Sequence, residues 1–226
     1  MVLIEQLLTK DEVATFREHL DQVPWKDGKG TAMGMSSSVK ENAQADASDD
    51  TVKQLANALL AKFGENPLLV SAVLPQKIFP PCFNRYASGE TYGLHVDGAI
   101  MRLPHSADVL RSDMSMTLFL SAPEEYEGGE LVIQTEFGEH RVKPQAGDAV
   151  TYPSGSLHQV TPVTSGVRVA AITWMQSLVA DTPMRQTLFE LDQTIQQLLN
   201  NDAVDRTQLD SLHHVYHNLI RMHAQV

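Results

Sequence analysis

Two side chains that bind metals in many proteins lie two residues apart near the middle of the chain. His95 and Asp97 occur in the segment 92–97. On a β-strand, this spacing sends both side chains to one face of the sheet, so that an imidazole nitrogen and a carboxylate oxygen can reach one metal ion. A pair of this kind also arises by chance, and a packed core histidine beside a turn-capping aspartate is the alternative interpretation.

A third candidate ligand and a candidate anion-binding cation follow in the second half of the chain. His158 comes after a turn and strand at 147–153, and Arg168 lies one predicted strand further on. If a hairpin centred on Val163 joins these strands, His158 and Arg168 lie opposite each other and share a face. The apolar neighbours on both sides of Arg168 leave open which face its side chain takes.

Two histidines and one carboxylate form the facial triad typical of non-heme Fe(II) oxygenases. The triad leaves three positions of an octahedral ferrous ion open. A 2-oxo acid can take two of these positions and dioxygen the third, while a planar guanidinium such as that of Arg168 can bind the distal carboxylate of the acid. A structural zinc site would instead be closed by a fourth protein ligand.

Other histidines and the single cysteine are weaker candidates for chemistry. His105 lies in a proline-containing loop, and charged neighbours place His140 on an edge or solvent-facing strand. His213 and His217 have the i, i+4 spacing of helical zinc sites, but the rest of that motif is missing, which favours a solvated or packing face. Cys82 is best explained as a small packed residue.

The elements that must position these residues fall into three predicted regions. Residues 1–76 show helical spacing, beginning with a Thr9–Glu12 capping box, and contain a Gly- and Ser-rich stretch at 28–50 that we expect to be a mobile loop closing over the pocket. Residues 77–178 form short β-rich runs separated by glycine turns, as in a sandwich or jelly roll. Residues 179–226 return to helical spacing and predict an antiparallel helical hairpin that packs on the core or forms a homodimer.

The composition limits the number of domains, the kinds of partner and the location that we expect for this protein. The 226 residues are 42% hydrophobic and 20% charged, which suits one main globular domain with appendages. The net charge of -11 disfavours nucleic-acid partners. One cysteine, no secretory leader pattern and no long apolar run predict a cytoplasmic protein without a membrane partner.

Several short motifs, taken together, resemble the bacterial PKHD-type hydroxylases, which are Fe(II)/2-oxoglutarate-dependent dioxygenases related to prolyl and lysyl hydroxylases. The resemblance extends over nearly the whole chain and rests on the segments 25–28, 84–86, 90–93, 95–98, 117–121, 128–131, 147–148, 152–154, 156–158, 166–168 and 188–192. It implies a mainly β core with flanking helices (α+β), folded as a double-stranded β-helix of the jelly-roll, cupin-like type.

The resemblance also implies roles for individual residues and cofactors. Iron would be held by His95, Asp97 and His158, and 2-oxoglutarate by Arg168 and Tyr86, with L-ascorbate as an associated cofactor. The implied reaction hydroxylates an unactivated C–H bond while 2-oxoglutarate and dioxygen give succinate and CO2. The substrate is either a peptidyl prolyl or lysyl residue or a small metabolite, and a link to iron homeostasis is implied as well.

Two other function classes stay open at this point. A cupin-like sensor would bind metal and a small acid in the same pocket without turnover, although metal-binding cupins usually add a second nearby histidine and a glutamate. A zinc hydrolase would act without 2-oxoglutarate and would leave Arg168 without a role.

Overall fold

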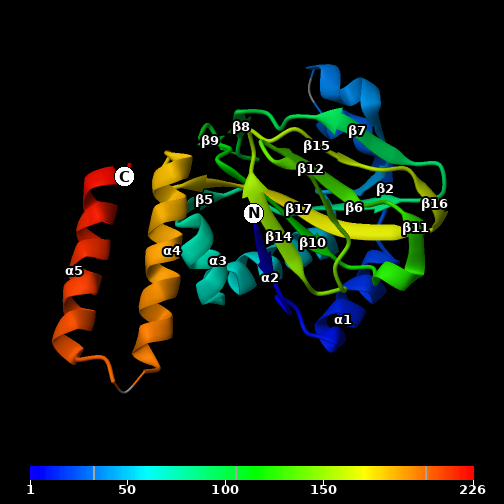
Figure 1. Ribbon diagram of the computed structural model, residues 1–226. Helices are drawn as coiled ribbons and strands as arrows, with labels where there is room; N and C mark the ends of the chain where they lie inside the picture. Colours follow the sequence, from blue (N-terminus) through cyan, green and yellow to red (C-terminus); the bar gives the residue numbers. More distant parts are fainter. Residues whose placement is uncertain (33, 105, 202) are drawn as a thin grey trace.

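In the computed structural model, which describes residues 1–32, 34–104, 106–201 and 203–226, two β-sheets face each other and helices cover the outer face of the larger one (Figure 1). The larger sheet contains, in spatial order, β1 (Val2–Ile4), β14 (Ala149–Pro153), β10 (Met114–Phe119), β17 (Arg168–Ser177), β6 (Cys82–Tyr86), β4 (Ala43–Ala45) and β2 (Trp25–Asp27), with β5 (Pro75–Ile78) paired to β17.

The smaller sheet carries most of the candidate metal ligands. Its spatial order is β13 (Gly138–Val142), β12 (Leu131–Thr135), β15 (His158–Val160), β7 (Thr91–His95) and β3 (Lys40–Glu41). Two further short pairs are β11 (Tyr126–Gly128) with β16 (Val163–Gly166) and β8 (Ile100–Arg102) with β9 (Val109–Arg111), and a 3-10 turn, η3 (Pro123–Glu125), precedes β11.

Three helices from the first third of the chain cover the larger sheet: α1 (Lys10–Leu20), α2 (Asp50–Glu65) and α3 (Pro67–Val73). The predicted capping box at the start of α1 is confirmed, since Thr9 and Glu12 each accept a hydrogen bond from the other's backbone N–H. The apolar faces of these helices and the outer face of the sheet form one core, in which Phe16 of α1 packs on Phe83 of β6.

Strand alternation divides the larger sheet into an apolar outer face and a polar inner face. Along β10, Met114, Met116 and Leu118 join the core under the helices, while Ser115 and Thr117 line the cavity between the sheets. The same alternation along β17 determines which face the Arg168 side chain takes, a question that the sequence left open. Val169 joins the outer core, and the Arg168 side chain points into the cavity with an exposed fraction of 1%.

The stretch 28–50 differs from the expected irregular mobile loop. It contains the 3-10 helices η1 (Gly28–Thr31) and η2 (Gly34–Val39), followed by β3 and β4, which join the smaller and the larger sheet respectively. The sequence signal was misleading because strands of two or three residues are too short to show periodicity. The closure of this segment over the pocket stays a prediction.

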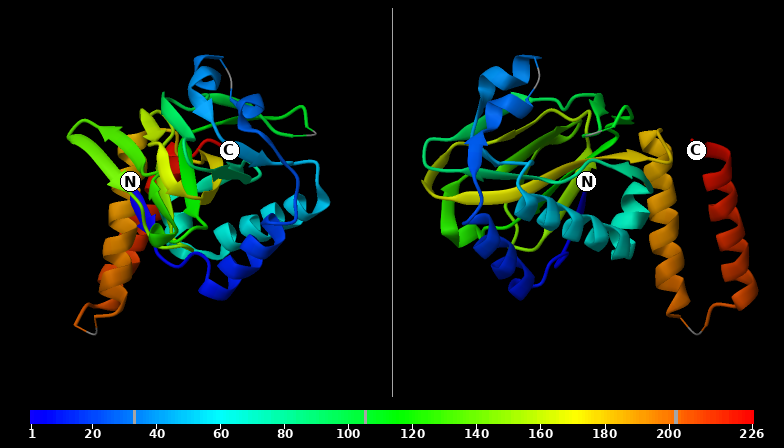
Figure 2. Two further views of the ribbon diagram at one scale, coloured as in Figure 1. Left: turned by 90° about the vertical axis from the view of Figure 1, so that its right-hand side faces the viewer. Right: turned by 180° about the vertical axis from the view of Figure 1, so that it is seen from behind.

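The predicted C-terminal hairpin is present as α4 (Thr182–Leu199) and α5 (Arg206–His223). The N-cap of α4 is Asp181, whose carboxylate accepts a hydrogen bond from the backbone N–H of Met184, and not Thr182, which the Thr182–Pro183 pattern predicts. Figure 2 shows, from behind, that α4 lies between α3 and α5. The Ser71 hydroxyl of α3 donates a 2.6 Å hydrogen bond to Asp192 of α4, which fixes the hairpin to the rest of the molecule.

The short β-rich runs predicted between residues 77 and 178 are confirmed as strands, and a pair of prolines, Pro80 and Pro81, separates β5 from β6. The sheets also recruit β1, β2, β3 and β4 from the first 76 residues, so those residues are not only helical. The division into three regions at 76 and 178 stays a prediction. Among the described residues, no helix is both long and apolar enough to cross a membrane.

Candidate active site

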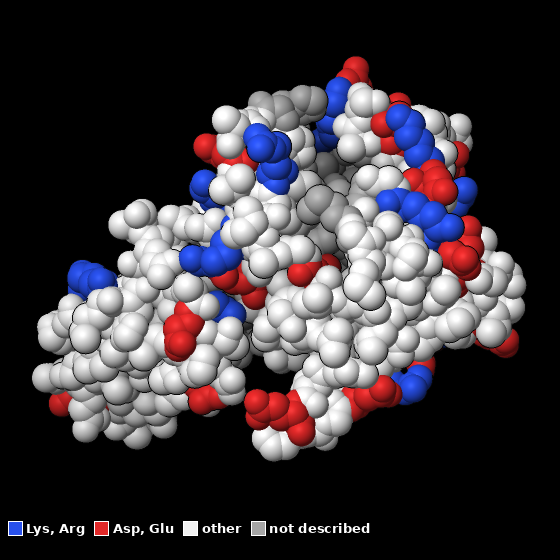
Figure 3. Space-filling view, turned by 90° about the horizontal axis from the view of Figure 1, so that it is seen from above, with Lys and Arg blue, Asp and Glu red and all other residues white. Residues whose placement is uncertain are grey.

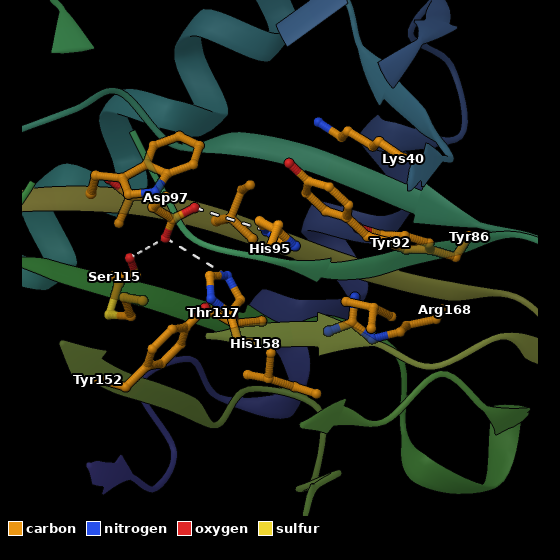
Figure 4. Close-up of a pocket in the computed structure, with 16 residues that line it drawn as sticks. Lys40, Tyr86, Tyr92, His95, Asp97, Ser115, Thr117, Tyr152, His158 and Arg168 are labelled. Carbon is orange, nitrogen blue, oxygen red and sulfur yellow. Dashed lines mark hydrogen bonds and ion pairs between the residues drawn. The ribbon is translucent and has the colours of Figure 1, made fainter. Parts of the chain in front are cut away.

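Three side chains from the smaller sheet and the loop after it converge in the cavity between the two sheets (Figure 4). His95 ends β7, Asp97 follows in the loop, and His158 begins β15, directly opposite His95 in the strand pairing. One ligand atom from each lies within 4.8 Å of the other two. Asp97 Oδ1 is 4.0 Å from His95 Nε2, and Asp97 Oδ2 is 3.7 Å from His158 Nε2.

Both imidazoles are oriented by the backbone. Nδ1 of His95 lies 2.7 Å from the carbonyl oxygen of Gly93, and Nδ1 of His158 lies 3.0 Å from that of Ser156. Because a carbonyl only accepts, each Nδ1 must carry the ring proton, which leaves Nε2 with a free lone pair. Both lone pairs face Asp97, the arrangement in which metal-bound histidines are commonly held.

The Asp97 carboxylate is fixed by a buried serine of the opposite sheet. Ser115 Oγ of β10 lies 2.5 Å from Asp97 Oδ2 and 2.8 Å from Ser154 Oγ. The two serines therefore form a short hydrogen-bond chain behind the carboxylate. Such a chain restricts the rotation of Asp97 and leaves Oδ1 free to bind a cation.

Aromatic rings enclose the two histidines and keep water away from them. The Tyr92 ring stacks on His95 with centroids 3.6 Å apart and planes 14° apart, and Tyr152 contacts His158 edge-on at 5.1 Å. Burial, followed by the charge of the neighbouring His158, lowers the pKa of His95 to about 4. His95 is therefore neutral near pH 7, as a metal ligand must be.

Arg168 lies deep in the same cavity among aromatic rings. Its guanidinium carbon is 5.3 Å from the ring centre of Tyr86, its strand partner on β6, and 5.1 Å from that of Phe119. Burial raises the pKa of Tyr86 to about 12, so the phenol stays protonated and able to donate. Arg168 Nε is buried and has no hydrogen-bond partner among the described residues.

The chemistry of this end of the cavity fits one carboxylate of a dicarboxylic acid. A buried guanidinium is unfavourable unless an anion binds it, and a carboxylate accepts two parallel hydrogen bonds from its nitrogens. The donor set of the three ligands fits a divalent metal equally well, because two neutral imidazoles and one carboxylate match Fe(II) and leave room on the cavity side.

Two geometric expectations from the sequence are wrong, although all four residues meet. Asp97 is not on a strand with His95, because β7 ends at His95. His158 and Arg168 do not face each other across a hairpin: β15 pairs with β7 in the smaller sheet, and β17 pairs with β6 and β10 in the larger one. A third strand, β16, separates them in the chain. They share the cavity from opposite walls.

The alternative candidates lie elsewhere. His140 is exposed on β13, the edge strand of the smaller sheet, and His213 and His217 lie on α5. His105 lies outside the described residues. Burial raises the pKa of Cys82 to about 11, which disfavours the reactive thiolate. Within the described part of the chain, no second group of three such side chains comes together as a possible metal site.

Sequence reasoning missed several residues around the ligands. Ser115, Tyr92 and Tyr152 contact the ligands directly, and Lys40 lines the same cavity. The alternation of Ser115 and Thr117 with apolar residues along β10 was a usable signal, since polar residues on one face of a central strand indicate a polar cavity. Lys40 gave no signal, because it lies in the stretch expected to be a loop.

Comparison with known proteins gives consistent matches over the whole chain. Residues 81–176 match the 2OG-Fe(II) oxygenase superfamily, and residues 183–225, which comprise most of α4 and α5, match the PKHD-type hydroxylase C-terminal domain. A PKHD-type hydroxylase of Alteromonas mediterranea is 65% identical over 226 residues and one of Shewanella frigidimarina is 62% identical over 226 residues, each match covering 100% of both chains.

A solved structure supports the fold. The crystal structure of a Pseudomonas putida prolyl-4-hydroxylase superimposes with a TM-score of 0.52 at 21% sequence identity, covering 78% of this chain and 91% of that chain. At this identity the likeness concerns the fold alone. Together with the family match, it confirms the predicted double-stranded β-helix core with flanking helices.

Proposed function

Because the chain belongs to the PKHD-type hydroxylases and is a 2-oxoglutarate-dependent dioxygenase, we propose that His95, Asp97 and His158 bind its Fe(II). The observation that carries this assignment is the convergence of one ligand atom from each residue within 4.8 Å. The hydrogen bonds that orient both imidazoles and the carboxylate support it, because they prepare the ligands before a metal arrives.

We assign the binding of 2-oxoglutarate to Arg168 and Tyr86. The guanidinium would form a charged pair with the distal carboxylate, and the protonated phenol of Tyr86, whose ring lies beside the guanidinium, would donate to the same group. Arg168, Tyr86 and the three proposed metal ligands line one cavity, so the cosubstrate would share this space with the metal.

When both are bound, Fe(II) and 2-oxoglutarate supply the oxidising chemistry of this family, which hydroxylates a C–H bond as 2-oxoglutarate gives succinate and CO2. The residues of the chain position the two and exclude water. Tyr92 and Tyr152 cover the imidazoles, and the Ser115–Ser154 pair holds the carboxylate of Asp97.

Succinate formation from 2-oxoglutarate under Fe(II) and air tests this function. We expect turnover by the parent protein and its loss in His95→Ala. Equal turnover by the two would contradict the assignment of the metal site. If dioxygen consumption never exceeds that of the metal alone with any candidate substrate, a binding or sensing role becomes the better account.

The finer features of the function are proposals that rest on the family resemblance. The substrate is a peptidyl prolyl or lysyl residue or a small metabolite, and the activity is linked to iron homeostasis. L-Ascorbate keeps the iron ferrous by donating electrons. Omitting ascorbate should shorten the period of linear succinate formation, and a strain carrying His95→Ala should grow more slowly than the parent when iron is limiting.

The assembly and location of the protein are proposals as well. The C-terminal hairpin exposes Val215 and Leu199 and is suited to contact a second copy of the chain. Sedimentation of the full chain at increasing concentration tests this homodimer, and Val215→Glu should weaken it. The low cysteine content favours the cytoplasm, which cell fractionation tests.

A further inference from the structure

Arg168 and Tyr126 each carry a buried polar atom that has no hydrogen-bond partner among the described residues. These atoms are Nε of Arg168 and the hydroxyl oxygen of Tyr126 on β11. Only 1% of Arg168 and 3% of Tyr126 is exposed, so bulk water does not satisfy them. Leaving a buried donor or acceptor unpaired is unfavourable, and native proteins mostly avoid it. The two atoms therefore call for a functional explanation.

The Tyr126 side chain lies beside the guanidinium of Arg168. Tyr126 and Tyr86 belong to one buried cluster, and the guanidinium carbon is 5.3 Å from the ring centre of Tyr86. Along the backbone, Tyr126 pairs with Gly166 of β16, two residues before Arg168. Burial raises the pKa of the Tyr126 phenol, while the charge and the N–H groups of Arg168 lower it. This influence requires the two side chains to be close together.

Two glycines make room for Tyr126 at this place. Gly166 has a φ of +75°, and a Cβ there would collide with the carbonyl oxygen of Glu125 and lie 2.8 Å from Cα of Tyr126. A Cβ on Gly129 would lie 3.0 Å and 3.1 Å from two carbons of the Tyr126 ring. Both glycines belong to motifs of the family resemblance, and the proposed function gives neither motif a role. The glycines let the phenol approach the start of β17.

A lysine holds the Tyr126 ring from its face. Nζ of Lys143 lies 4.1 Å from the ring centre and donates a 2.7 Å hydrogen bond to the carbonyl oxygen of Tyr126. With Gly129 at its edge and Lys143 on its face, the ring has little freedom to rotate. The hydroxyl is therefore preorganised next to Arg168.

Tyr126 can act on the cosubstrate only through Arg168. Arg168 lines the cavity between the sheets, whereas Tyr126 is not among the residues that do. A guanidinium presents five N–H donors in a plane, and a carboxylate can pair with its two terminal nitrogens or with Nε and one of them. When Nε donates to a phenol, the edge with both terminal nitrogens is left for the carboxylate. The phenol thus determines which edge of the guanidinium faces the cavity.

We propose that Tyr126 is a positioning residue for 2-oxoglutarate: its hydroxyl accepts a hydrogen bond from Nε of Arg168 and directs both terminal nitrogens toward the distal carboxylate. The inference rests on the proposed function and adds a residue to it. Because the effect passes through the distal carboxylate, Tyr126 matters for acids that carry this group and not for 2-oxo acids that lack it. A packing role for Tyr126 makes no such distinction.

The first measurement is binding to the Co(II)-loaded full chain, followed by the visible absorption of the metal. The ligands are 2-oxoglutarate and pyruvate, which has the same 2-oxo acid end but no distal carboxylate. In Tyr126→Phe, we expect the dissociation constant for 2-oxoglutarate to rise at least about tenfold and that for pyruvate to stay within about twofold of the parent value. An unchanged affinity for 2-oxoglutarate would overturn the proposal.

The second measurement repeats the titration in the Arg168→Met background. Arg168→Met alone should weaken 2-oxoglutarate binding at least about tenfold, and adding Tyr126→Phe should change the dissociation constant by less than about twofold, because Nε is already gone. A further tenfold loss in the double variant would show that Tyr126 acts independently of Arg168 and would overturn the proposal. If Arg168→Met itself binds 2-oxoglutarate like the parent, the proposed function is contradicted instead.

Tyr216→Phe is the matched control. Tyr216 is a half-buried tyrosine of α5 in the hairpin, which forms the lobe at the left of Figure 3, and it does not line the cavity. Its affinity for both acids should stay within about twofold of the parent.

Urea denaturation of the metal-free chain separates positioning from packing. Tyr126→Phe should unfold at the same urea concentration as the parent, because the variant removes a hydroxyl that has no partner. A lower midpoint of unfolding, together with equally weaker binding of both acids, would assign Tyr126 to packing and overturn the proposal.

Discussion

Two pairs of histidines in this protein have similar apparent potential to bind a metal, yet their surroundings differ. The rings of His95 and His158 lie 4.2 Å apart in the cavity between the sheets, and those of His213 and His217 lie 6.2 Å apart on α5. In the first pair each Nδ1 is held by a backbone carbonyl, and Asp97 completes the set. On α5, no carboxylate among the described residues completes a group of three.

The proposed metal site thus differs from the histidine pair on α5 in the orientation of its side chains more than in their type. The two sheets fix the cavity ligands before a metal arrives, so binding does not have to order them. Side chains on an exposed helix lose rotational freedom when they bind, and water competes for them. The hairpin histidines thus serve as internal controls for the cavity.

The largest effect on activity is expected when a cavity histidine is removed, and the matched variant removes both histidines of the hairpin. His95→Ala should lower the rate of succinate formation at least about 100-fold, because one of the three metal ligands is lost. The double variant His213→Ala, His217→Ala should keep the rate within about twofold of the parent. A comparable loss of activity in the hairpin variant would show that the two clusters are not functionally distinct.

Two buried arginines, Arg168 in the cavity and Arg185 in the hairpin, allow a second comparison of the two regions. Arg168→Met should raise the KM for 2-oxoglutarate about 30-fold, since a charged hydrogen-bonded pair contributes about 2 kcal/mol. Arg185 of α4 donates instead to the Val179 and Ala180 carbonyls and to the Thr182 hydroxyl. Arg185→Met should lower the free energy of unfolding by about 2–4 kcal/mol, measured by urea denaturation, with an unchanged KM.

A smaller effect is expected from two serines that each donate to an aspartate. Ser115→Ala removes the support of Asp97 and should weaken Co(II) binding about 10-fold, with little change in stability. Ser71→Ala removes the hydrogen bond to Asp192 and should lower the free energy of unfolding by about 1 kcal/mol while Co(II) affinity stays the same. Equal metal affinity in Ser115→Ala and the parent would exclude this supporting role.

The sequence was sufficient for the elements whose patterns are long and local. The capping box at Thr9 and the helical spacing before residue 76 and after residue 178 were predicted from local patterns, and the structure has α1, α2 and α4 in these regions. The four residues that spacing, residue types and the family resemblance together predicted as neighbours do line one cavity, although not through the strand pairing that the spacing suggested.

The pairing of strands could not be read from the sequence. His158 and Arg168 were expected in one hairpin, yet they belong to different sheets, because β16 pairs with β11 and separates them. Strand partners depend on tertiary packing that periodicity does not encode. The same limit hid β3, whose two residues bring Lys40 into the cavity. Because Lys40 follows a serine-rich stretch, the sequence alone suggests a surface residue, and only the pairing of β3 shows that it is buried.

The central claim is that His95, Asp97 and His158 form the metal site of this dioxygenase, and anaerobic equilibrium binding of Fe(II) tests it most directly. The account predicts one Fe(II) per chain in the parent and in the His213→Ala, His217→Ala variant, and no measurable binding at the same concentrations in Asp97→Ala. Retention of one Fe(II) by a folded Asp97→Ala protein, or its loss from the hairpin variant, would contradict the account.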